Sequence, residues 1–539
     1  MPVRFGALAL SGLRLAGQAI TLCPEGGGPM LAYESDIRLA ARTGPLALAG
    51  TLGDSPANLA ADAVVLRYPS PFAITALAAQ IGAPGSEIRV SAATLTGSLA
   101  GEISGEFAGG SAQMEVVPLD IGALAGRWSF ADGVLRVGDG AFTLTDRVVE
   151  GEPRFKPLMA RGASLLFDGN AITADATLRH PASDKMVTSV AIAHQLDTAR
   201  GNARLSVPGI VFDKSLQPED LSYLAKGVIA FADGTVSGNG RIDWIGDDIT
   251  SNGTFASDGV NFAAAFGPVR GLAGEVRFTD LLNLTTAPDQ RVRIAAINPG
   301  IEVLDGTVQF EVKDGTLLNL EDARFPFMGG ELRMRPLAMD FSQPEERRYV
   351  FEIIGLDAAT FVTQMELTNL GATGTFDGTV PIVFDTDGNG RIIGGLLVSR
   401  APGGNVAYIG ELTYEDLGAM GNYAFSALRS LDYRQMSVGL NGDLAGEIIT
   451  NFDFDGVRQG EGTSQNFVTR RLAKLPIRFK VNVRSENFYE LATMVRSLWD
   501  VDFLGNPVDR GLLKAEGGRF VPANPAAKPV QLPESEDQP

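Results

Sequence analysis

Cysteine and histidine are nearly absent from this sequence, which has one cysteine, Cys23, and two histidines, His180 and His194, in 539 residues. A single cysteine excludes an internal disulfide framework and a thiolate metal cluster. The histidines lie on separate segments with no Asp/Ser or Cys constellation nearby, and no G-x-S-x-G, Walker, H-E-x-x-H or C-x-x-C motif occurs. We therefore expect two ordinary surface histidines and no enzymatic activity, although the many carboxylates leave a glycosidase-type acid pair open.

Positive charge is also scarce. The 45 Lys and Arg residues are outnumbered by 64 Asp and Glu residues, which gives a formal net charge of −19. Nucleic-acid binding requires Lys and Arg to neutralise phosphates, and attachment to an anionic leaflet requires a polybasic segment. The charge balance argues against both classes of partner.

Long hydrophobic runs are missing as well. The most apolar windows, such as FAITALAAQIGA (72–83), are shorter than the roughly 18–20 residues that span a bilayer. The opening residues, MPVRFGALALSGLRLAGQ, alternate like a strand and lack the charged and apolar regions of a signal peptide. Either the protein is soluble, or this chain lacks an N-terminal anchor that a longer form carries.

What the sequence has in abundance is alternation of apolar and polar residues. In VQFEV (308–312), Val308, Phe310 and Val312 would share one face of a strand. The same pattern occurs in GEVRF (274–278), RVRI (291–294), ELRM (331–334), YVFEI (349–353) and IRFKVNVR (477–484). Period-two alternation is typical of strands with one dry face and one wet face, so the fold class is mainly β.

Asp-Gly and Asn-Gly steps are spread through the whole chain. They tolerate the positive φ angles of tight turns, and between alternating segments they predict β-hairpins. We expect turns at the Asp-Gly steps 132–133, 139–140, 168–169, 233–234, 258–259, 305–306, 314–315, 377–378, 387–388 and 455–456, and at the Asn-Gly steps 239–240, 252–253, 389–390 and 441–442.

Helical patterns are few and short. Pro218 at a first helical position and Gly227 as a stop predict a two-turn helix over 218–227. Apolar spacing predicts further helices over 356–366, 416–431 and 485–503.

One segment resembles a calcium loop. In VPIVFDTDGNGRIIGGLLVS (380–399), Asp385 and Asp387 occupy positions 1 and 3 of an EF-hand, but position 12 is Leu396 in place of a bidentate carboxylate. The flanking residues alternate like strands, and Pro381 disfavours an entering helix. We interpret the segment as a hairpin turn, with a weak Ca²⁺ contact at the two aspartates as the alternative, and expect no other metal or cofactor.

The order of segments between 216 and 491 resembles the AsmA-like superfamily of bacterial envelope proteins, in particular its YdbH-type branch. The segments are LQPEDLSYLAKGVIAFADGTVSGNGRIDW (216–244), GPVRGLAGEVRFTDLLNLTTAPDQRVRIAAINPGIEVLDGTVQFEV (267–312), GGELRM (329–334), GATGTFDGTVPIVF (371–384), APGGNVAY (401–408), ALRSLDYRQMSVGLNGDLAGEIITNFDFDG (427–456) and LPIRFKVNVRSENFYEL (475–491). The first 200 residues share only the general style of the strands.

This resemblance implies a long antiparallel sheet curled into an elongated apolar groove, as in bridge-like lipid transfer proteins. It implies phospholipid acyl chains as cargo, transfer from the inner to the outer membrane, and a location in the periplasm of a Gram-negative bacterium. The family's N-terminal helix in the inner membrane is missing from this chain, and a partner protein in the periplasm or outer membrane is implied. The expected divisions are 1–215 and 216–484 as two parts of the groove, 485–510 as a terminal amphipathic helix and 511–539 as a disordered tail.

The alternating segments supply candidates for the groove lining. They are Val276, Phe278, Ile294, Val308, Phe310, Val312, Leu332, Met334, Phe351, Ile353, Phe479 and Val481. The alternative interpretation is that these residues form the ordinary core of a closed sandwich or β-solenoid. In that case the protein would be a structural or adhesive β-scaffold without catalytic activity.

Overall fold

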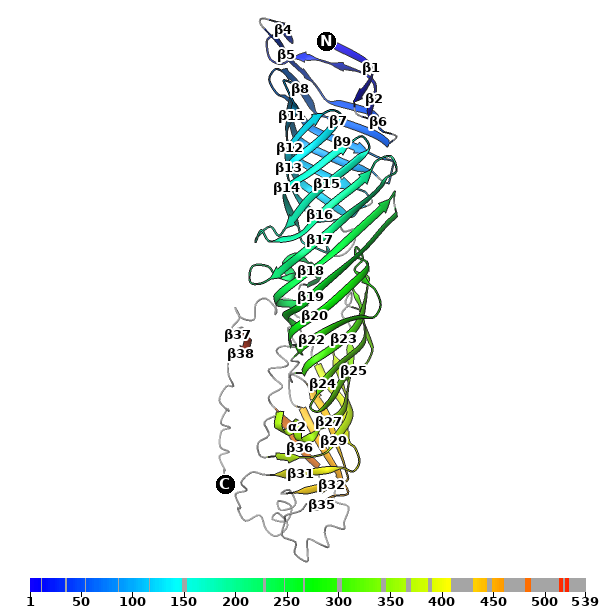
Figure 1. The fold of residues 1–539 in the computed structure, drawn as a ribbon, viewed down its shortest axis with the longest axis vertical. Helices are drawn as coiled ribbons and strands as arrows, with labels where there is room; N and C mark the ends of the chain where they lie inside the picture. Colours follow the sequence, from blue (N-terminus) through cyan, green and yellow to red (C-terminus); the bar gives the residue numbers. More distant parts are fainter. Residues whose placement is uncertain are drawn as a thin grey trace, which may run out of the picture.

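The protein is built on one very long antiparallel sheet. The computed structural model describes residues 1–10, 12–33, 36–53, 55–85, 87–115, 117–147, 153–225, 229–246, 248–264, 267–297, 303–340, 346–364, 370–385, 390–408, 430–443, 448–459, 480–485, 513–516 and 519–522. Thirty-two of the described strands belong to this sheet. In Figure 1 the sheet forms an elongated body, with the strands inclined across it and the sequence running from one end towards the other.

The N-terminal half of the sheet consists of seventeen strands up to residue 212. They are β1 (Pro2–Leu10), β2 (Leu13–Thr21), β3 (Cys23–Pro24), β4 (Leu31–Tyr33), β5 (Ile37–Thr43), β6 (Leu46–Leu52), β7 (Ser55–Ala61), β8 (Ala63–Tyr68), β9 (Phe72–Ile81), β10 (Ile88–Ser98), β11 (Ile103–Met114), β12 (Leu119–Ala131), β13 (Val134–Asp146), β14 (Leu158–Asp168), β15 (Ala171–Arg179), β16 (Met186–Gln195) and β17 (Arg200–Phe212).

The C-terminal half continues the same sheet. Its strands are β18 (Ile229–Ile245), β19 (Asp248–Ala264), β20 (Gly267–Asp280), β21 (Thr285–Thr286), β22 (Gln290–Ile297), β23 (Val303–Lys313), β24 (Leu317–Phe327), β25 (Gly330–Met334), β26 (Leu337–Asp340), β27 (Arg347–Asp357), β29 (Thr375–Phe384), β30 (Gly390–Ser399), β33 (Gln435–Asp443), β34 (Ile448–Asp455) and β36 (Lys480–Ser485). A small second sheet holds β28 (Leu370–Ala372), β31 (Gly404–Tyr408), β32 (Leu431–Tyr433) and β35 (Arg458–Gln459), and β37 (Leu513–Glu516) pairs with β38 (Arg519–Pro522).

The ladder runs almost in sequence order. Its pairings lead from β1 through β2, β6, β7 and β9, then strand by strand from β10 to β20, and on through β22, β23, β24, β25, β27, β29, β30, β33 and β34 to β36. Among the described residues no pairing joins β1 to β36, so the sheet is open. It also continues from β17 to β18 across the predicted division at residue 215.

Helices contribute little to the described part of the chain. The predicted helix over 218–227 is shorter than expected, with α1 over Pro218–Leu221 followed by a 3₁₀ turn over Tyr223–Ala225. The predicted helix over 356–366 is α2, Ala358–Gln364. Most of the predicted helix over 416–431 lies outside the described residues, and Leu431 belongs to a strand. The predicted helix over 485–510 also lies outside them, except that Ser485 ends β36.

The Asp-Gly steps have two structural roles, only one of which the sequence indicated. At 132–133 and 314–315 both residues have positive φ and join consecutive strands as predicted. The prediction of turns was wrong for several other steps, which lie inside strands: 139–140 in β13, 239–240 and 233–234 in β18, 252–253 and 258–259 in β19, 305–306 in β23, 377–378 in β29 and 441–442 in β33. Register shifts occur beside Asp139, Asp233 and Asp258, so these steps mark β-bulges.

These bulges explain how a single sheet can curl. Near the middle of β9, β11, β12, β13 and β14, one residue adopts positive φ: Ala76, Gly109, Ala123, Asp139 and Gly162. We call this set the bulge line. A bulge bends its strand and increases the local twist, and bends at mid-strand in adjacent strands curve the sheet across its width. Side chains contact one another across the resulting trough, and near its C-terminal end α2 and the small second sheet also pack on the apolar face.

Candidate functional site

The register of the ladder keeps one apolar face continuous from β6 to β29. Directly paired residues of antiparallel strands point to the same side, so the face can be followed from strand to strand. In the C-terminal half it passes through these pairs: Gly238 with Phe255, Phe255 with Val276, Leu272 with Ile294, Val292 with Val308, Val308 with Ala323, Ala323 with Met334, Met334 with Phe351, and Phe351 with Val380.

The structure places ten of the twelve sequence-predicted lining residues on this face. They are Val276, Phe278, Ile294, Val308, Phe310, Val312, Leu332, Met334, Phe351 and Ile353. Ile294 and Ile353 are buried at 8% exposure and the others are half-buried. The backbone of Val481 pairs with Phe452, and Phe479 lies outside the described residues.

The same face continues through the N-terminal half, where the sequence had suggested no lining residues. It passes through Leu48 with Leu59, Leu59 with Ala79, Ala79 with Val90, Val90 with Ala112, Ala112 with Ile121, Ile121 with Leu144, Leu144 with Leu158, Leu165 with Ala174, Ala174 with Ile192, Ile192 with Ala203, and Ala203 with Ile242. Alanine occupies many of these positions. The alternation is therefore present in the sequence but much weaker than around Phe310.

Coverage of the apolar face differs between the two halves. On the N-terminal strands, Val90 is 37% exposed and Ile103 is 36% exposed although both belong to this face. In the C-terminal half, side chains of the face pack on one another around Val269 and Leu320, and around Phe376 they pack against Tyr433 and other residues of the small second sheet and α2. The trough is therefore more open near β10–β11 and more completely filled by protein side chains beyond β20.

Glycines allow aromatic rings to lie flat on the apolar face. A Cβ atom on Gly306 would lie 2.0 Å from Cε1 of Phe325, and one on Gly238 would lie 2.5 Å from Cδ1 of Phe255. The ring of one strand therefore covers the missing side chain of a neighbouring strand, an arrangement that compensates for glycine in a sheet. The result is a smooth apolar surface.

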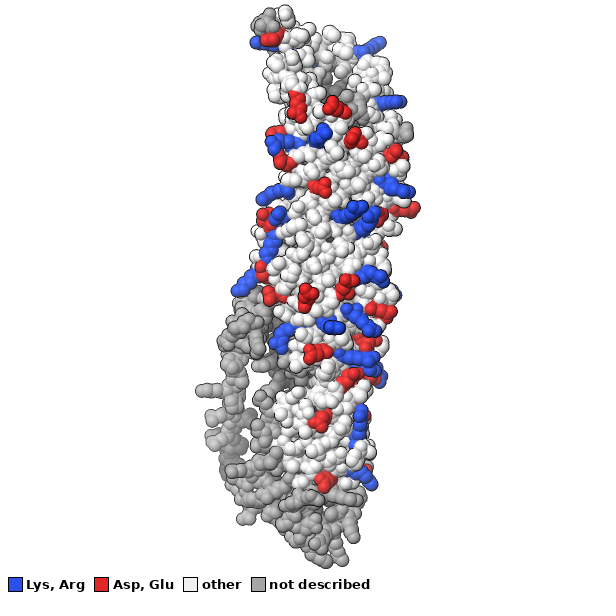
Figure 2. All heavy atoms as spheres, in the orientation of Figure 1, with Lys and Arg blue, Asp and Glu red and all other residues white. Residues whose placement is uncertain are grey.

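The opposite face of the sheet is polar. Figure 2 shows basic and acidic side chains interspersed along the body, without a large region of one sign. Neighbouring opposite charges pair on this face, as Arg241 does with Asp243 at 2.6 Å and Arg335 with Glu352 at 2.6 Å. Such pairs lie near solvent and contribute little stability individually.

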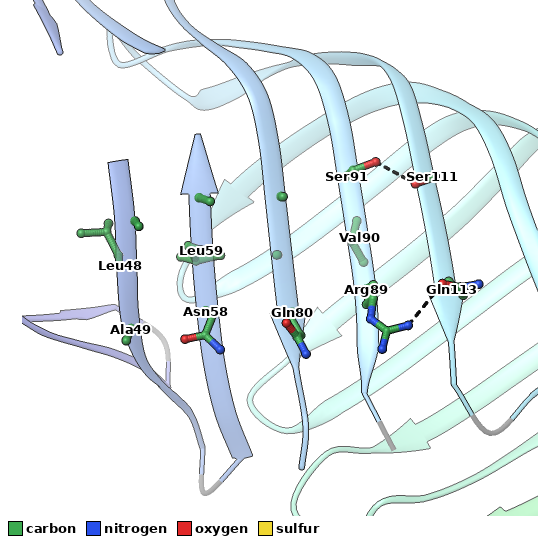
Figure 3. A pocket seen from close by; sticks show the side chains of 14 residues that line it. Leu48, Ala49, Asn58, Leu59, Gln80, Arg89, Val90, Ser91, Ser111 and Gln113 are labelled. Carbon is green, nitrogen blue, oxygen red and sulfur yellow. Dashed lines mark hydrogen bonds between the residues drawn. The ribbon is translucent and has the colours of Figure 1, made fainter. Parts of the chain in front are cut away.

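A hollow with a volume of about 490 Å³ lies over β6–β11, beside polar side chains such as Arg89 and Ser91 (Figure 3). Ser91 and Ser111 are joined by a hydrogen bond of 2.7 Å, and Arg89 forms ion pairs with Glu115 and Glu87. In the alternation of β10, Val90 points to the apolar side and Arg89 and Ser91 point to the polar side. The lining of the hollow also includes Leu48, Leu59, Ala79 and Val90 of the apolar face, and its one cation, Arg89, is paired with carboxylates.

The two long edges of the curled sheet touch in the N-terminal half. At the β6–β7 hairpin, Ser55 Oγ donates a hydrogen bond of 3.4 Å to the carbonyl oxygen of Leu196, which follows β16. Leu52, Ala57 and Leu196 form one buried cluster there. These contacts join ends of strands that lie eight or more positions apart in the ladder, so the sheet wraps around its apolar face (Figure 1).

A second contact between the edges involves Arg154, in the segment between β13 and β14. Its Nη1 donates a hydrogen bond of 2.7 Å to the carbonyl oxygen of Leu282, which follows β20. Its Nη2 pairs with Asp146, whose side chain is only 1% exposed. The backbone N–H of Arg154 also donates to this carboxylate, at 2.6 Å. We call the two contacts, at Ser55 and at Arg154, the seam.

His194 departs from the expectation of two surface histidines. It belongs to the apolar face, is 8% exposed and lies beside Trp244, which is 4% exposed. Burial lowers the pKa of the His194 imidazole. His180 is half-buried near the end of β15, and its Nδ1 lies 2.9 Å from Ser183 Oγ.

No arrangement of catalytic or metal-binding residues is seen in the described part of the chain. Within it, no group of three or more His, Cys, Asp and Glu side chains is placed to hold a metal ion. The segment that resembles a calcium loop connects β29 and β30, which pair as the hairpin interpretation requires, with Phe384 opposite Gly390. Asp385 is half-buried, and Asp387 lies outside the described residues.

Comparison with protein families agrees with this architecture. The family model YdbH-like, described as intermembrane phospholipid transport protein YdbH, matches residues 6–501. The chain belongs to the YdbH-like family. The match extends the relationship from the segments between 216 and 491 into the N-terminal half, in agreement with a YdbH-like sheet that is continuous through both. A search of the curated proteins and of the solved structures found no significant match. Within the described residues, none of the helices has the length and apolar character needed to cross a membrane.

Proposed function

We propose that this YdbH-like chain carries phospholipids across the periplasm of a Gram-negative bacterium, between the inner and the outer membrane, and so supports biogenesis of the outer membrane. The acyl chains would lie against the apolar face of the curled sheet. The observation that carries the proposal is the continuity of this face from β6 to β29, through every intervening pairing of the main ladder.

The surface must lower the free-energy cost of exposing acyl chains to water, and the hydrophobic effect gives the size of that cost. Each CH₂ group exposed to water costs about 0.8 kcal/mol, so two ~16-carbon chains cost on the order of 25 kcal/mol. A continuous apolar surface lowers this barrier at every step between the membranes. It requires no covalent chemistry, and we propose that the protein has no catalytic activity.

The residues named from the sequence, from Val276 to Ile353, are proposed as acyl-chain contacts. We extend the proposal to Val90, which is 37% exposed, and to its half-buried neighbours on the face, Leu59 and Leu95, of which Leu95 pairs with Ile74 and Phe107. The family resemblance further implies an inner-membrane tether and a receiving protein or membrane at the other end.

A structural β-scaffold is the second candidate, and one observation favours it. In the clusters around Val269 and Phe376, the apolar face is buried by side chains of the protein alone. If all of the face behaved in this way, no surface would remain for a lipid.

The two candidates differ in what the purified protein contains. Protein purified without detergent and examined by native mass spectrometry should carry phospholipid, and chemical extraction should identify acyl chains and headgroups. It should also accept fluorescent phospholipid from donor vesicles and deliver it to acceptor vesicles. Lipid-free protein that neither binds nor transfers phospholipid would exclude the transport function and leave the scaffold.

A further inference from the structure

Three residues form a row across the apolar face at the ends of three adjacent strands. His194 in β16 pairs with Gly201 in β17, and Gly201 pairs with Trp244 in β18. All three therefore point to the trough side. The neighbouring row on the same face is Ile192, Ala203 and Ile242, so the polar atoms of His194 and Trp244 are set in an apolar surface.

Gly201 brings the two aromatic side chains together. A Cβ atom on Gly201 would lie 2.3 Å from Cζ2 of Trp244, so the indole covers this glycine and reaches the strand beyond it. There it stacks on His194, with ring centroids 5.9 Å apart and planes inclined by 28°. Trp244 Nε1 lies 3.1 Å from His194 Nδ1 and donates a hydrogen bond to it.

This hydrogen bond determines which nitrogen of His194 carries the proton. The indole N–H can only donate, so Nδ1 must accept and cannot hold a proton. The neutral imidazole then carries its proton on Nε2. Among the described residues, no acceptor is hydrogen-bonded to Nε2.

The surroundings of the row are apolar. The buried cluster around Trp244 consists of Ala203 and Ile242, with Met114, Val190, Ile192, Leu205, Ile249 and Leu282 packed against it. Nε2 of His194 is not among the fully buried polar atoms without a partner in the described residues, so an acceptor can reach its N–H from the accessible side. Met114 comes from the opposite edge of the sheet, and its unbranched side chain can change rotamer to admit a ligand.

We propose that His194 Nε2–H is a recognition point inside the trough, which donates a hydrogen bond to an acceptor oxygen in the ester or phosphate region of a bound lipid. Trp244 holds the imidazole in the tautomer that this donation requires. The row thereby fixes the position along the trough at which the polar part of the lipid binds, while the acyl chains contact the apolar face. This inference rests on the proposed transport function, because it requires a lipid in the trough.

The small number of histidines allows a direct test. With ¹⁵N-labelled imidazoles, the spectrum of the full chain contains His180 and His194 only, and a His180→Gln variant assigns them. Four probes separate the possible acceptors: dioleoyl phosphatidylglycerol, its dialkyl ether analogue, dioleoylglycerol and squalane. We expect the His194 Nε2 signal to shift with lipids that carry an acceptor and not with squalane, while His180 is unchanged. Phosphatidylglycerol should shift the signal in either case. A shift with the ether analogue but not with dioleoylglycerol identifies the phosphate, and a shift with dioleoylglycerol but not with the ether analogue identifies the ester.

Affinity measurements with two variants complete the test. His194→Phe keeps an aromatic ring but removes the donor, and should weaken phosphatidylglycerol binding about tenfold without changing squalane binding. His194→Gln retains an N–H donor and an acceptor, and should recover most of the loss. If phosphatidylglycerol binds the wild type but the His194 signal does not move, the inference is wrong, even if both variants fail to fold. If no probe binds at all, the transport function itself fails.

Discussion

The guanidinium of Arg154 and the backbone carbonyl of Leu282 are joined by a hydrogen bond of 2.7 Å, although the two residues are 128 positions apart. The bond connects the two long edges of one sheet and belongs to no strand pairing. The contacts at the seam are therefore made by a few side chains and loops, whereas the strands of the sheet are held together by continuous backbone hydrogen bonds.

Removal of Arg154 should open the seam. Arg154→Ala leaves the carboxylate of Asp146, 1% exposed, without its cation, and the loss of one partner of a buried pair costs about 3 kcal/mol. The control is Arg127→Ala, because Arg127 and its partner Asp139 are both well exposed and should contribute less than about 1 kcal/mol. Hydrogen exchange should accelerate around 146–158 and 280–284 in the first variant only. Equal protection in the two variants would mean that Arg154 does not hold the edges together.

A charge on the apolar face should block lipid carriage. Leu95 and Thr94 are adjacent on β10 and point to opposite faces, since Leu95 pairs with Ile74 and Phe107 while Thr94 pairs with Thr75 and Ala108. Leu95→Arg should abolish vesicle-to-vesicle transfer, because an acyl chain cannot compensate a desolvated guanidinium. Thr94→Arg adds the same charge on the exposed polar face and should transfer normally. Transfer that is equally reduced in both would indicate an effect of net charge.

Phe310→Arg distinguishes the conduit from a closed scaffold in the better-covered half. If lipid contacts this half-buried ring, the variant should fold with a thermal midpoint near that of the wild type and lose bound phospholipid. If the ring belongs to a closed core, the buried charge should lower stability by several kcal/mol. Circular dichroism melting combined with lipid extraction separates these outcomes.

Acidification should destabilise the protein through His194. Its pKa is lowered by burial, so as the pH falls through about 6.5 the unfolded chain takes up the proton before the native protein does. The free energy of unfolding should fall by up to about 1.4 kcal/mol per pH unit until the native pKa is reached. Urea unfolding at pH 7.5 and 5.5 should show this decline in the wild type and in His180→Gln, but not in His194→Phe. A decline that persists in His194→Phe would assign it to other groups.

Glycine under an aromatic ring should resist substitution. In Gly306→Ala the new methyl group would lie 2.0 Å from the Phe325 ring, and displacing the ring should cost roughly 1–3 kcal/mol. At Gly138 no atom lies within 4 Å of the added methyl and no positive φ is involved, so Gly138→Ala should be neutral or slightly stabilising. Denaturant midpoints compare the two, and a neutral Gly306→Ala would show that the ring has room to move.

The sequence predicted the strands of the sheet and the faces of their side chains better than the bulges that curve the sheet. Alternation around Val308 and Val276 identified strands and the faces of their side chains, because both depend on local period. The Asp-Gly steps were ambiguous, since positive φ suits a hairpin turn and a bulge equally. Only the pairing partners show that 132–133 is a turn and that 139–140 interrupts a strand.

The row of His194, Gly201 and Trp244 could not have been predicted from its parts. His194 and Trp244 are fifty residues apart, and their contact depends on the register of two successive hairpins. A shift of one residue in either hairpin would turn one side chain to the opposite face. The lining of the N-terminal half was missed for a different reason, because alanine gives a weak hydrophobic signal even where it faces the trough.

Because of the bulge line, the curvature of the sheet and the chemical nature of its apolar face depend on different residues. Backbone torsion at a few positions such as Ala123 and Gly162 shapes the curvature of the sheet, whereas the side chains between them determine the chemical nature of its apolar face. Relocating a bulge by two residues would change the width of one segment and reverse only the side chains between the old and the new position. Moving a bulge therefore changes the width of the trough with little change in the chemical nature of its lining.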